Sequence, residues 1–478
     1  MSGPARTGAA APRIYAVPEP LVDPADRAIL AEVRRRWFDR RPDGTGLPDA
    51  RRISERLEEM ATADPRLADR DLRERLARAL AADLLGLGPL DPLLHDPDIE
   101  DIACDGVGIP IFVHHRRDGW VATDRSFASA EELDRFVRRL AQRSGRTIST
   151  REPLLEATLP GGARLHASLG AQVTTRGSTF TIRRFPERAR TPLDLLAHGT
   201  WSAELASFLW LALEAGRSMF LVGGTASGKT TTLNALLSFL PPERKVVSIE
   251  DTRELHLNQE NWIPLSTREE GGADPAASID MFDLLSAALR QRPDFLVVGE
   301  VRGREAATVF QAIATGRACL STFHADGVRA MVHRMESAPI SLPRSLLAAV
   351  PLLIVQRQVW RDGGPARRIE AVVEVEGQDR DTGEIVTSTV FRWDPVRDAC
   401  EFTGRSAILA AIARERHLPP AAVDREWERR SRWLARTAAP PGRGESVGEF
   451  ARQLAAFRSE PLALPPPAAA ARATPAAP

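Results

Sequence analysis

Residues 220–233 read FLVGGTASGKTTTL and contain the complete motif G-x-x-x-x-G-K-[ST] between Gly223 and Thr230. Apolar residues 219–222 precede the motif and predict a buried strand, and leucines at helical spacing follow it. This strand–loop–helix context is what a phosphate-binding loop requires, because the backbone N–H groups of the loop and the N-terminus of the helix surround a phosphate. The stretch therefore predicts that the chain binds a nucleoside triphosphate.

The loop residues have distinct expected roles. Lys229 would reach the β- and γ-phosphates, and the hydroxyl of Thr230 would bind Mg²⁺. Lys229 and Lys245 are the only lysines among 64 basic residues, and a lysine kept in so arginine-rich a chain indicates that a compact ammonium is needed there. Nucleotide contacts are expected from Gly223, Gly224, Thr225, Ala226, Ser227, Gly228, Lys229, Thr230 and Thr231.

Length and composition set limits on the class of protein. A chain of 478 residues is too long for one ordinary domain, and a formal net charge of zero gives no general attraction for nucleic acid. The three cysteines are isolated from one another, which favours neither a disulfide framework nor a structural zinc site and suits a reducing compartment. Because no apolar run approaches the length of a membrane span and residues 1–12 lack the apolar region of a secretory signal, we expect a soluble or peripheral cytoplasmic protein.

The chain is predicted to be of the α/β class and to contain several successive segments. Strand-helix alternation after the phosphate loop implies a parallel sheet covered on both faces. The expected order is a flexible N-terminus (1–22), a helical region (23–84), a smaller α/β domain (85–185), a linker (186–192), a phosphate-loop domain with C-terminal helices (193–460) and a disordered Pro/Ala tail (461–478).

Two predicted strands beyond the loop run into acidic residues. The first leads to Glu250, Asp251 and Glu254, at the sheet edge where the phosphates would lie; one of these carboxylates would orient the attacking water or hold the Mg²⁺ shell, and the choice among them stays open. An acidic cap on a helix is the structural alternative. The second strand, 295–298, leads to Glu300, which is the layout of a Walker B element and predicts a metal-binding acid.

Two further groups of residues are candidates for contact with the nucleotide. His324 follows an apolar strand, and because that strand belongs to a sheet already assigned to phosphate, a role as a γ-phosphate sensor is the better interpretation. An arginine from another domain or subunit can neutralise charge in the transition state of phosphoryl transfer. The candidates for that role lie before the phosphate-loop domain: Arg164, Arg176, Arg183 and Arg184.

Together these motifs resemble those of the secretion, pilus and archaellum assembly ATPases of the type II/IV secretion system family. The family pattern comprises a Walker A motif (223–230), an Asp box (249–254), a Walker B motif with Glu (296–300, with Gly303) and a His box (315–325), in this order and spacing. Stretches such as ENWIP (260–264) and IDMFDLL (279–285) look most like the archaeal branch. The resemblance covers roughly residues 85–460.

The resemblance implies a RecA-like ATPase domain joined by a linker to a smaller N-terminal α/β domain, in a hexameric ring that binds ATP and Mg²⁺. It also implies a catalytic role for Glu250, Glu300 and His324, with Thr230 and Glu300 at the metal. The implied partner is a polytopic membrane platform protein, so the protein would lie at the inner face of the membrane and power assembly of a pilus-like filament or secretion.

Two alternative functions remain to be compared with this motor. A RecA-like nucleic-acid translocase is the runner-up, but the neutral net charge and the lack of a basic patch interleaved with aromatic residues argue against nucleic acid. A scaffold that binds ATP without turnover is the non-enzyme alternative, and the intact acids at positions 250 and 300 argue against it.

Overall fold

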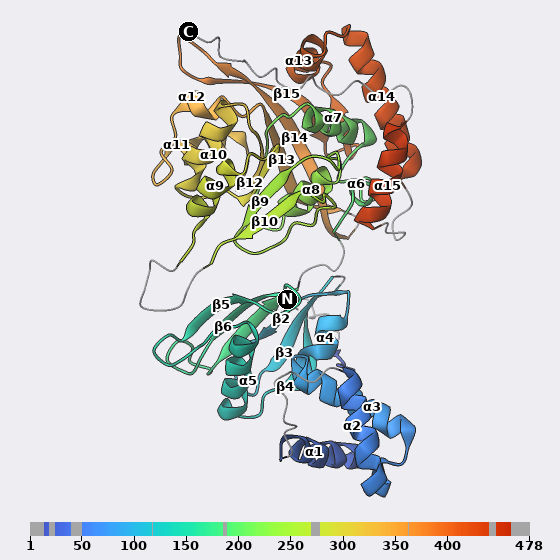
Figure 1. Cartoon of the computed structure of the whole chain (residues 1–478). Helices are drawn as coiled ribbons and strands as arrows, with labels where there is room; N and C mark the ends of the chain where they lie inside the picture. The colour runs from blue at the N-terminus through green and yellow to red at the C-terminus, as the bar shows by residue number, and fades with distance from the viewer. Residues whose placement is uncertain are drawn as a thin grey trace, which may run out of the picture. The chain divides into compact units, whose positions relative to one another are not determined.

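The computed structural model describes residues 14–18, 24–39, 50–116, 118–184, 189–268, 278–361, 363–438 and 446–459. The chain divides into two compact units, Met1–Glu187 and Arg188–Pro478 (Figure 1). The predicted Pro/Ala tail lies outside the described residues, and so does part of the predicted linker.

The first unit begins with a small group of helices that have their own hydrophobic core. These are α1 (Pro24–Asp39), α2 (Ala50–Ala63) and α3 (Arg70–Leu84), with a 3₁₀ turn at Pro65–Leu67. Leu72, Leu76 and Leu80 share one face of α3 because residues three and four apart are neighbours on a helix, and all three are buried in this core. The carboxylate of Asp69 accepts a hydrogen bond from the backbone of Asp71 and so caps the start of α3.

A mixed sheet forms the rest of the first unit. Within the described residues its strand order is β1-β4-β3-β2-β7-β6-β5. Helix α5 (Ala130–Arg143) presents a buried apolar face to the core of this unit and is capped by the Ser129 hydroxyl. The other bounds are β1 (Ile14–Tyr15), α4 (Asp91–His95), β2 (Ile99–Cys104), β3 (Pro110–His115), β4 (Gly119–Ser126), β5 (Leu154–Thr158), β6 (Arg164–Ser168) and β7 (Thr179–Arg183), with a 3₁₀ turn at Gly88–Leu90.

Residues 1–22 are predicted to be flexible, but residues 14–18, the described part of this range, include strand β1. It pairs in parallel with β4, and the hydroxyl of Tyr15 donates a hydrogen bond to the carboxylate of Asp96. The backbone N–H of Val17 donates to Asp124, and the side chain of Val17 is buried. The prediction followed the Pro, Ala and Gly content of residues 1–22 and gave less weight to the four adjacent apolar residues 14–17. Their partner strand β4 lies about a hundred residues further along the chain.

The second unit is built on one large sheet. Among the described residues its strand order is β10-β9-β11-β12-β8-β13-β14-β15-β16, and the neighbouring strands from β10 to β13 all pair in parallel. The strand that carries the phosphate loop, β8, therefore lies between β12 and β13. The bounds are β8 (Met219–Gly223), β9 (Val246–Glu250), β10 (Trp262–Ser266), β11 (Phe295–Glu300), β12 (Ala318–His324), β13 (Leu352–Arg361), β14 (Gly364–Gln378), β15 (Ile385–Asp394) and β16 (Ala399–Phe402).

Helices cover both faces of the parallel part of this sheet, as predicted (Figure 1). Side chains alternate along each strand, so Leu221 belongs to the core on one face and Val222 to the core on the other. One face is covered by α7 (Ala203–Glu214), α8 (Lys229–Leu237), α13 (Ala407–Glu415), α14 (Pro420–Thr437) and α15 (Val447–Arg458), the other by α9 (Met281–Arg290), α10 (Glu305–Ala314), α11 (Val328–Glu336) and α12 (Arg344–Leu347); a short helix, α6 (Pro192–Ala197), precedes α7. The second unit is thus of the α/β class, as predicted, with the G-x-x-x-x-G-K-[ST] loop between a central parallel strand and a helix.

Strand β10 was not predicted, and its position explains why. It contains Pro264, which lacks the N–H that a central strand must donate. β10 lies at the edge of the sheet and pairs only with β9 in the described part of the chain, so one side of it needs no donors.

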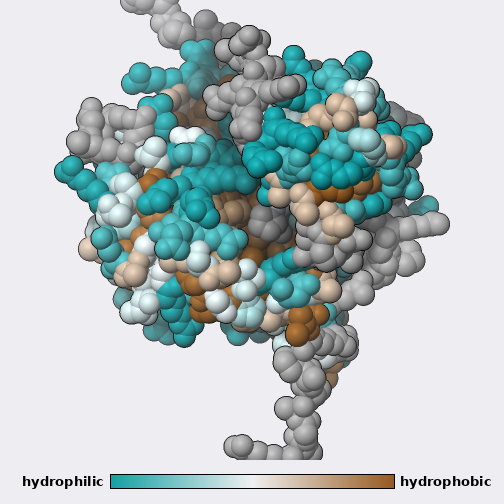
Figure 2. Space-filling model, turned by 90° about the horizontal axis from the view of Figure 1, so that it is seen from below, coloured by the Kyte–Doolittle hydropathy of each residue, from teal (hydrophilic) through white to brown (hydrophobic). Residues whose placement is uncertain are grey.

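None of the helices in the described residues is both long and apolar enough to cross a bilayer. On the face shown in Figure 2, hydrophilic residues predominate and smaller hydrophobic areas lie between them. The most exposed large apolar side chains are Val396 and Trp360.

Candidate active site

The phosphate loop connects β8 to α8 through a backbone that only glycine allows at two positions. A Cβ at Gly223 would lie 2.3 Å from the backbone oxygen of Gln356 on the neighbouring strand β13. Gly228, directly before α8, has φ +93°, and a Cβ there would lie 2.9 Å from Nε2 of Gln356. The two glycines of the motif therefore let β13 pack against the loop.

The ammonium group of Lys229 points back into the loop. It donates hydrogen bonds to the carbonyl oxygens of Gly223 at 2.9 Å and Gly224 at 2.8 Å. Burial lowers the pKa of Lys229, and the nearby carboxylate of Glu300 opposes that shift. The Ser227 hydroxyl, which is buried, donates to Gly224 at 2.9 Å. A cation is thus held inside the loop, where a phosphate would meet it.

The remaining loop residues lie on the exposed side of the loop and in the first turn of α8. Thr225 and Ala226 are exposed, and Ala226 has a positive φ of 56°. Thr230 and Thr231 lie in the first turn of α8 and are half-buried. The structure therefore brings all nine predicted loop residues together at the carboxyl end of β8.

Glu250, at the end of β9, is a buried carboxylate in a sheet whose interior is otherwise mostly apolar. It is 3% exposed, and its Oε1 accepts hydrogen bonds from the backbone N–H groups of Glu254 at 2.7 Å and Leu255 at 3.0 Å. Its Oε2 is buried without a hydrogen-bond partner among the described residues. Burial raises the pKa of Glu250 to about 7, although these two backbone donors act in the opposite direction. A buried carboxyl poised near neutral pH is suited to accept a proton.

The two other acids of the Asp box have different surroundings. Asp251 forms an ion pair with Arg302, and its carboxylate also accepts a hydrogen bond from the Thr267 hydroxyl at 3.3 Å. Glu254 is half-buried, and its backbone rather than its carboxylate supports Glu250. Of the three acids that the sequence left open, Glu250 therefore has the deepest burial and a free oxygen.

Glu300 ends β11, the strand of the predicted Walker B element. A bulge in the pairing of β11 with β12 falls between Val298 and Glu300, and it places Glu300 opposite Thr322. The Thr322 hydroxyl donates to the carbonyl of Gly299 at 2.7 Å, which fixes the irregular turn of the strand. Glu300 is half-buried and close enough to Lys229 to affect the pKa of that lysine.

His324 is the last residue of β12 and lies opposite Gly223 in the parallel pairing of β12 with β8. It is half-buried, and its carbonyl accepts a hydrogen bond from Arg334. Asp326, to which the sequence assigned no role, also lies near the loop, since a Cβ at Gly224 would be 3.8 Å from its Oδ1. The His box thus borders the first glycines of the loop.

The four candidate arginines all belong to the first unit, and each has a different environment there. Arg164 forms an ion pair with Glu156 at 3.3 Å, and Arg183 forms one with Asp101 at 3.1 Å. Arg184 donates to the carbonyls of Asp96 and Ile99, whereas Arg176 is exposed.

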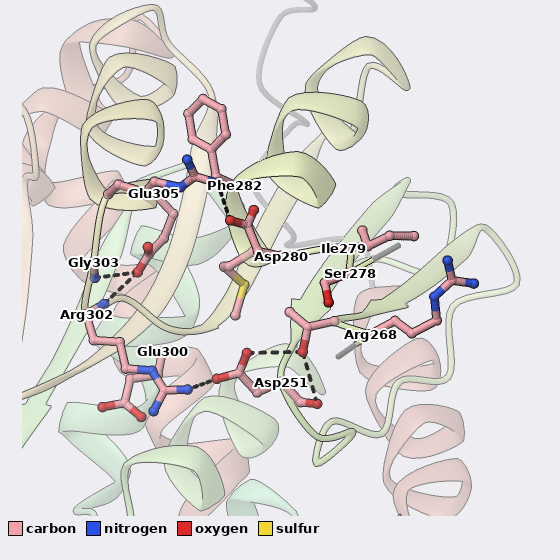
Figure 3. A pocket seen from close by; sticks show the side chains of 13 residues that line it. Asp251, Arg268, Ser278, Ile279, Asp280, Phe282, Glu300, Arg302, Gly303 and Glu305 are labelled. Carbon is pink, nitrogen blue, oxygen red and sulfur yellow. Dashed lines mark hydrogen bonds and ion pairs between the residues drawn. The ribbon is translucent and has the colours of Figure 1, made fainter. Parts of the chain in front are cut away.

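A cavity of about 490 Å³ is lined by Asp251, which follows β9, and by residues 300 and 302–305, which begin at the end of β11. Asp251 and Arg302 point toward one another there, and Glu305 accepts hydrogen bonds from the backbone N–H groups of Arg302 and Gly303, each at 2.7 Å (Figure 3). Glu300 also lines this cavity, but the phosphate loop does not. The cavity therefore lies beside the candidate site rather than within the phosphate loop.

Two residues that contact the candidate site were not predicted from the sequence. Gln356 is 2% exposed and touches both motif glycines from β13. Asn234, on α8, bonds to the segment that follows Glu250. For Gln356 no local pattern could have revealed the contact, because β13 lies about 130 residues beyond the loop. For Asn234 the signal was an amide among the apolar residues of a helix that faces the core.

Comparison with known proteins identifies one family over most of the chain. The family model described as type II/IV secretion system protein matches residues 86–431. An uncharacterized protein of the archaeon Methanocaldococcus jannaschii is 40% identical over 336 residues, which are 70% of this chain and 60% of that protein. The chain thus spans less than two thirds of the length of this relative.

Bacterial relatives are more distant. The type IV secretion system protein PtlH of Bordetella pertussis is 30% identical over 321 residues, 59% of this chain and 92% of that protein. Among solved structures, the ATPase DotB of Legionella pneumophila aligns with a TM-score of 0.43 and 19% identity, covering 77% of this chain and 94% of that one. The higher identity of the archaeal relative agrees with the predicted resemblance to the archaeal branch.

Proposed function

The chain belongs to the type II/IV secretion system protein family, and we propose that it is a Mg²⁺-dependent ATPase motor that powers assembly of a pilus-like or archaellum-like filament, or protein secretion. The observation that carries this proposal is the meeting of Lys229, Glu250 and Glu300 at one edge of the parallel sheet. In open α/β sheets, ligands bind outside the carboxyl ends of the strands.

The phosphates of ATP fit the phosphate loop as the structure has it. Lys229 already donates to two loop carbonyls, and it would exchange these bonds for bonds to the β- and γ-phosphates. The backbone N–H groups at the start of α8 and the positive end of the helix dipole favour the same negative charge.

The residues at this edge suit Mg²⁺ as the cofactor. Hydroxyl and carboxylate oxygens are its preferred ligands, and in such sites it takes one or two protein ligands together with the phosphates. Thr230 and Glu300 would supply those ligands. Phosphate and water oxygens would complete the coordination. When bound, Mg²⁺ neutralises charge that develops on the phosphates.

Hydrolysis would use Glu250 as the base. As the oxygen of a water molecule bonds to the γ-phosphorus and the bond to ADP breaks, the proton of that water passes to the carboxylate of Glu250. The unpartnered Oε2 is the atom free to accept it. His324, opposite Gly223, would contact the γ-phosphate side. One or more of Arg164, Arg176, Arg183 and Arg184 would stabilise the transition state from the first unit of the same chain or of a neighbour.

The motor role includes three expectations about assembly. The chain would form a homo-hexamer, dock on a polytopic membrane platform protein and lie at the cytoplasmic face of the membrane without binding nucleic acid. Support comes from family membership and from PtlH, which is itself a type IV secretion system protein.

The direct test is steady-state ATP hydrolysis by the purified full chain, alone, with DNA and with anionic lipid vesicles. We expect turnover that requires Mg²⁺, rises with vesicles and not with DNA, and is lost in Glu300→Gln. Stimulation by DNA would instead favour the nucleic-acid translocase, and no turnover in any condition would favour the scaffold.

Assembly is tested separately by light scattering after gel filtration with a non-hydrolysable ATP analogue. A species of six times the monomer mass is expected with the analogue, and a monomer at all protein concentrations would contradict the ring.

A further inference from the structure

Asn234 lies on the buried side of α8, one turn beyond the phosphate loop. Its side chain is 8% exposed and makes two hydrogen bonds with backbone groups of a distant segment. Its Nδ2 donates to the carbonyl of Glu254 at 2.8 Å, and its Oδ1 accepts from the N–H of His256 at 2.9 Å. Through these two hydrogen bonds the amide holds the backbone on both sides of Leu255.

The same segment determines how the carboxylate of Glu250 points. The N–H groups of Glu254 and Leu255 both donate to Oε1 of Glu250. These two bonds take up Oε1 and leave Oε2 as the free oxygen. A continuous series of four hydrogen bonds thus runs from the phosphate-loop helix through residues 254–256 to Glu250.

We propose that Asn234 is a positioning residue, which ties the helix that holds the phosphates to the segment that orients Glu250. This inference rests on the proposed function, because it assigns to Glu250 the role of base. Its consequence is that the orientation of the Glu250 carboxylate relative to the phosphates depends on α8 as well as on strand β9, which carries Glu250. Reaction rates depend steeply on such orientations.

The charged groups around Glu250 determine what a pH profile would show. Arg253 favours the ionised form of Glu250 and Glu254 opposes it. On the neighbouring strands, β10 places the uncharged Ser266 beside Glu250, and β11 brings Gly299 against it with Glu300 one residue further. On α8 the nearest charge along the helix is Lys229, and the 254–256 segment itself contains His256. None of these residues changes in the variants below.

The test compares Asn234→Ala with the matched control Gln259→Ala in the full chain. Gln259 is also 8% exposed and also bonds a buried amide to a backbone carbonyl, that of Leu240 at 3.3 Å, but it does not bond to residues 254–256. Asn234→Ala should lower kcat about tenfold and leave the KM for ATP within about twofold. The acid side of its kcat profile should move to higher pH, because the two backbone donors that stabilise ionised Glu250 become mobile.

Amide hydrogen exchange of the 250–257 peptide gives a readout that does not require turnover. Exchange should rise in Asn234→Ala and stay unchanged in Gln259→Ala, with thermal unfolding reporting any general loss of stability. If Asn234→Ala does not fold, Asn234→Leu replaces it, since leucine fills a similar volume without the two bonds.

The outcomes separate this inference from the proposed function. The inference would be overturned if the wild type hydrolyses ATP but Asn234→Ala shows the same acid limb and the same amide exchange as the wild type. That outcome would leave the proposed function intact. Equal loss in Asn234→Ala and Gln259→Ala would show a merely structural amide and would also overturn it. Increased exchange in a chain that never hydrolyses ATP would support the tether and reject the function.

Discussion

The side chain of Glu250 on β9 packs against the bare α-carbon of Gly299 on β11, so that a Cβ on Gly299 would lie 3.3 Å from Cγ of Glu250. Position 299 comes directly before Glu300, so one glycine lies beside the proposed base and next to the proposed metal ligand. The close approach of β11 to β9 is thus part of the geometry of the proposed active site.

Gly299→Ala should slow hydrolysis by about tenfold without loss of ATP binding. A methyl group at 3.3 Å displaces Glu250 by a few tenths of an ångström, and displacements of that order reduce rates when they fall between reacting groups. The measurement is kcat and KM for ATP. Gly364→Ala is the control, since a Cβ at Gly364 meets nothing within 4 Å, and equal kinetics in the two variants would contradict the packing argument.

Glu250 should give the enzyme an acid limb near neutral pH. Only the ionised carboxylate can accept a proton, and burial raises its pKa to about 7, so kcat/KM should fall tenfold per unit as the pH drops below about 7. Glu250→Gln should lose at least about 100-fold in kcat while still binding ATP. A profile flat from pH 5.5 to 8 in the wild type would show that another group accepts the proton.

The same burial makes Glu250 costly for folding at high pH. Burial favours the protonated carboxyl and raises the pKa of Glu250 in the folded protein from 4.5 to about 7. The stability of the folded state is therefore greatest, as far as this group is concerned, below pH 4.5, and this advantage is lost as the pH rises through 7. Above pH 7 the ionised form costs about 3 kcal/mol, by 1.36 kcal/mol for each pKa unit. Glu250→Gln should therefore raise the Tm relative to wild type at pH 8 and much less at pH 5. An equal Tm difference at both values would exclude this cause.

Asp251 should contribute far less than Glu250 to catalysis. Its carboxylate is engaged by Arg302, whose side chain is 59% exposed, and exposed ion pairs stabilise by about 1 kcal/mol or less. Asp251→Asn should keep kcat within about threefold, because it does not remove the proton acceptor. A loss as large as that of Glu250→Gln would move the base to position 251.

Sequence reasoning succeeded where the structure depends on neighbouring residues and failed where it depends on contacts made at long range. The strand, loop and helix around Lys229 are consecutive in the chain, and acids at strand ends mark the carboxyl edge of a parallel sheet. The sequence could not show which of Glu250 and Asp251 is the better candidate for the base, because the burial of Glu250 depends on Gly299 from another strand. The contact of Gln356 with Gly223 and the pairing of Ile14 with Ala122 likewise arise only when distant segments meet.

The two lysines of the chain offer a matched pair of substitutions. Lys229→Arg should lose ATP binding by more than tenfold, because a planar guanidinium cannot occupy the space in which one ammonium reaches the carbonyls of Gly223 and Gly224 at once. Lys245 also donates to a backbone carbonyl, that of Gln291 at 2.7 Å, but it lies at the opposite end of β9 from Glu250. Lys245→Arg should therefore bind and hydrolyse ATP like the wild type. Titration with a fluorescent ATP analogue measures the affinity of both variants. If Lys229→Arg binds ATP like the wild type, the ammonium group has no special role in binding, and the presence of lysine at position 229 has another cause.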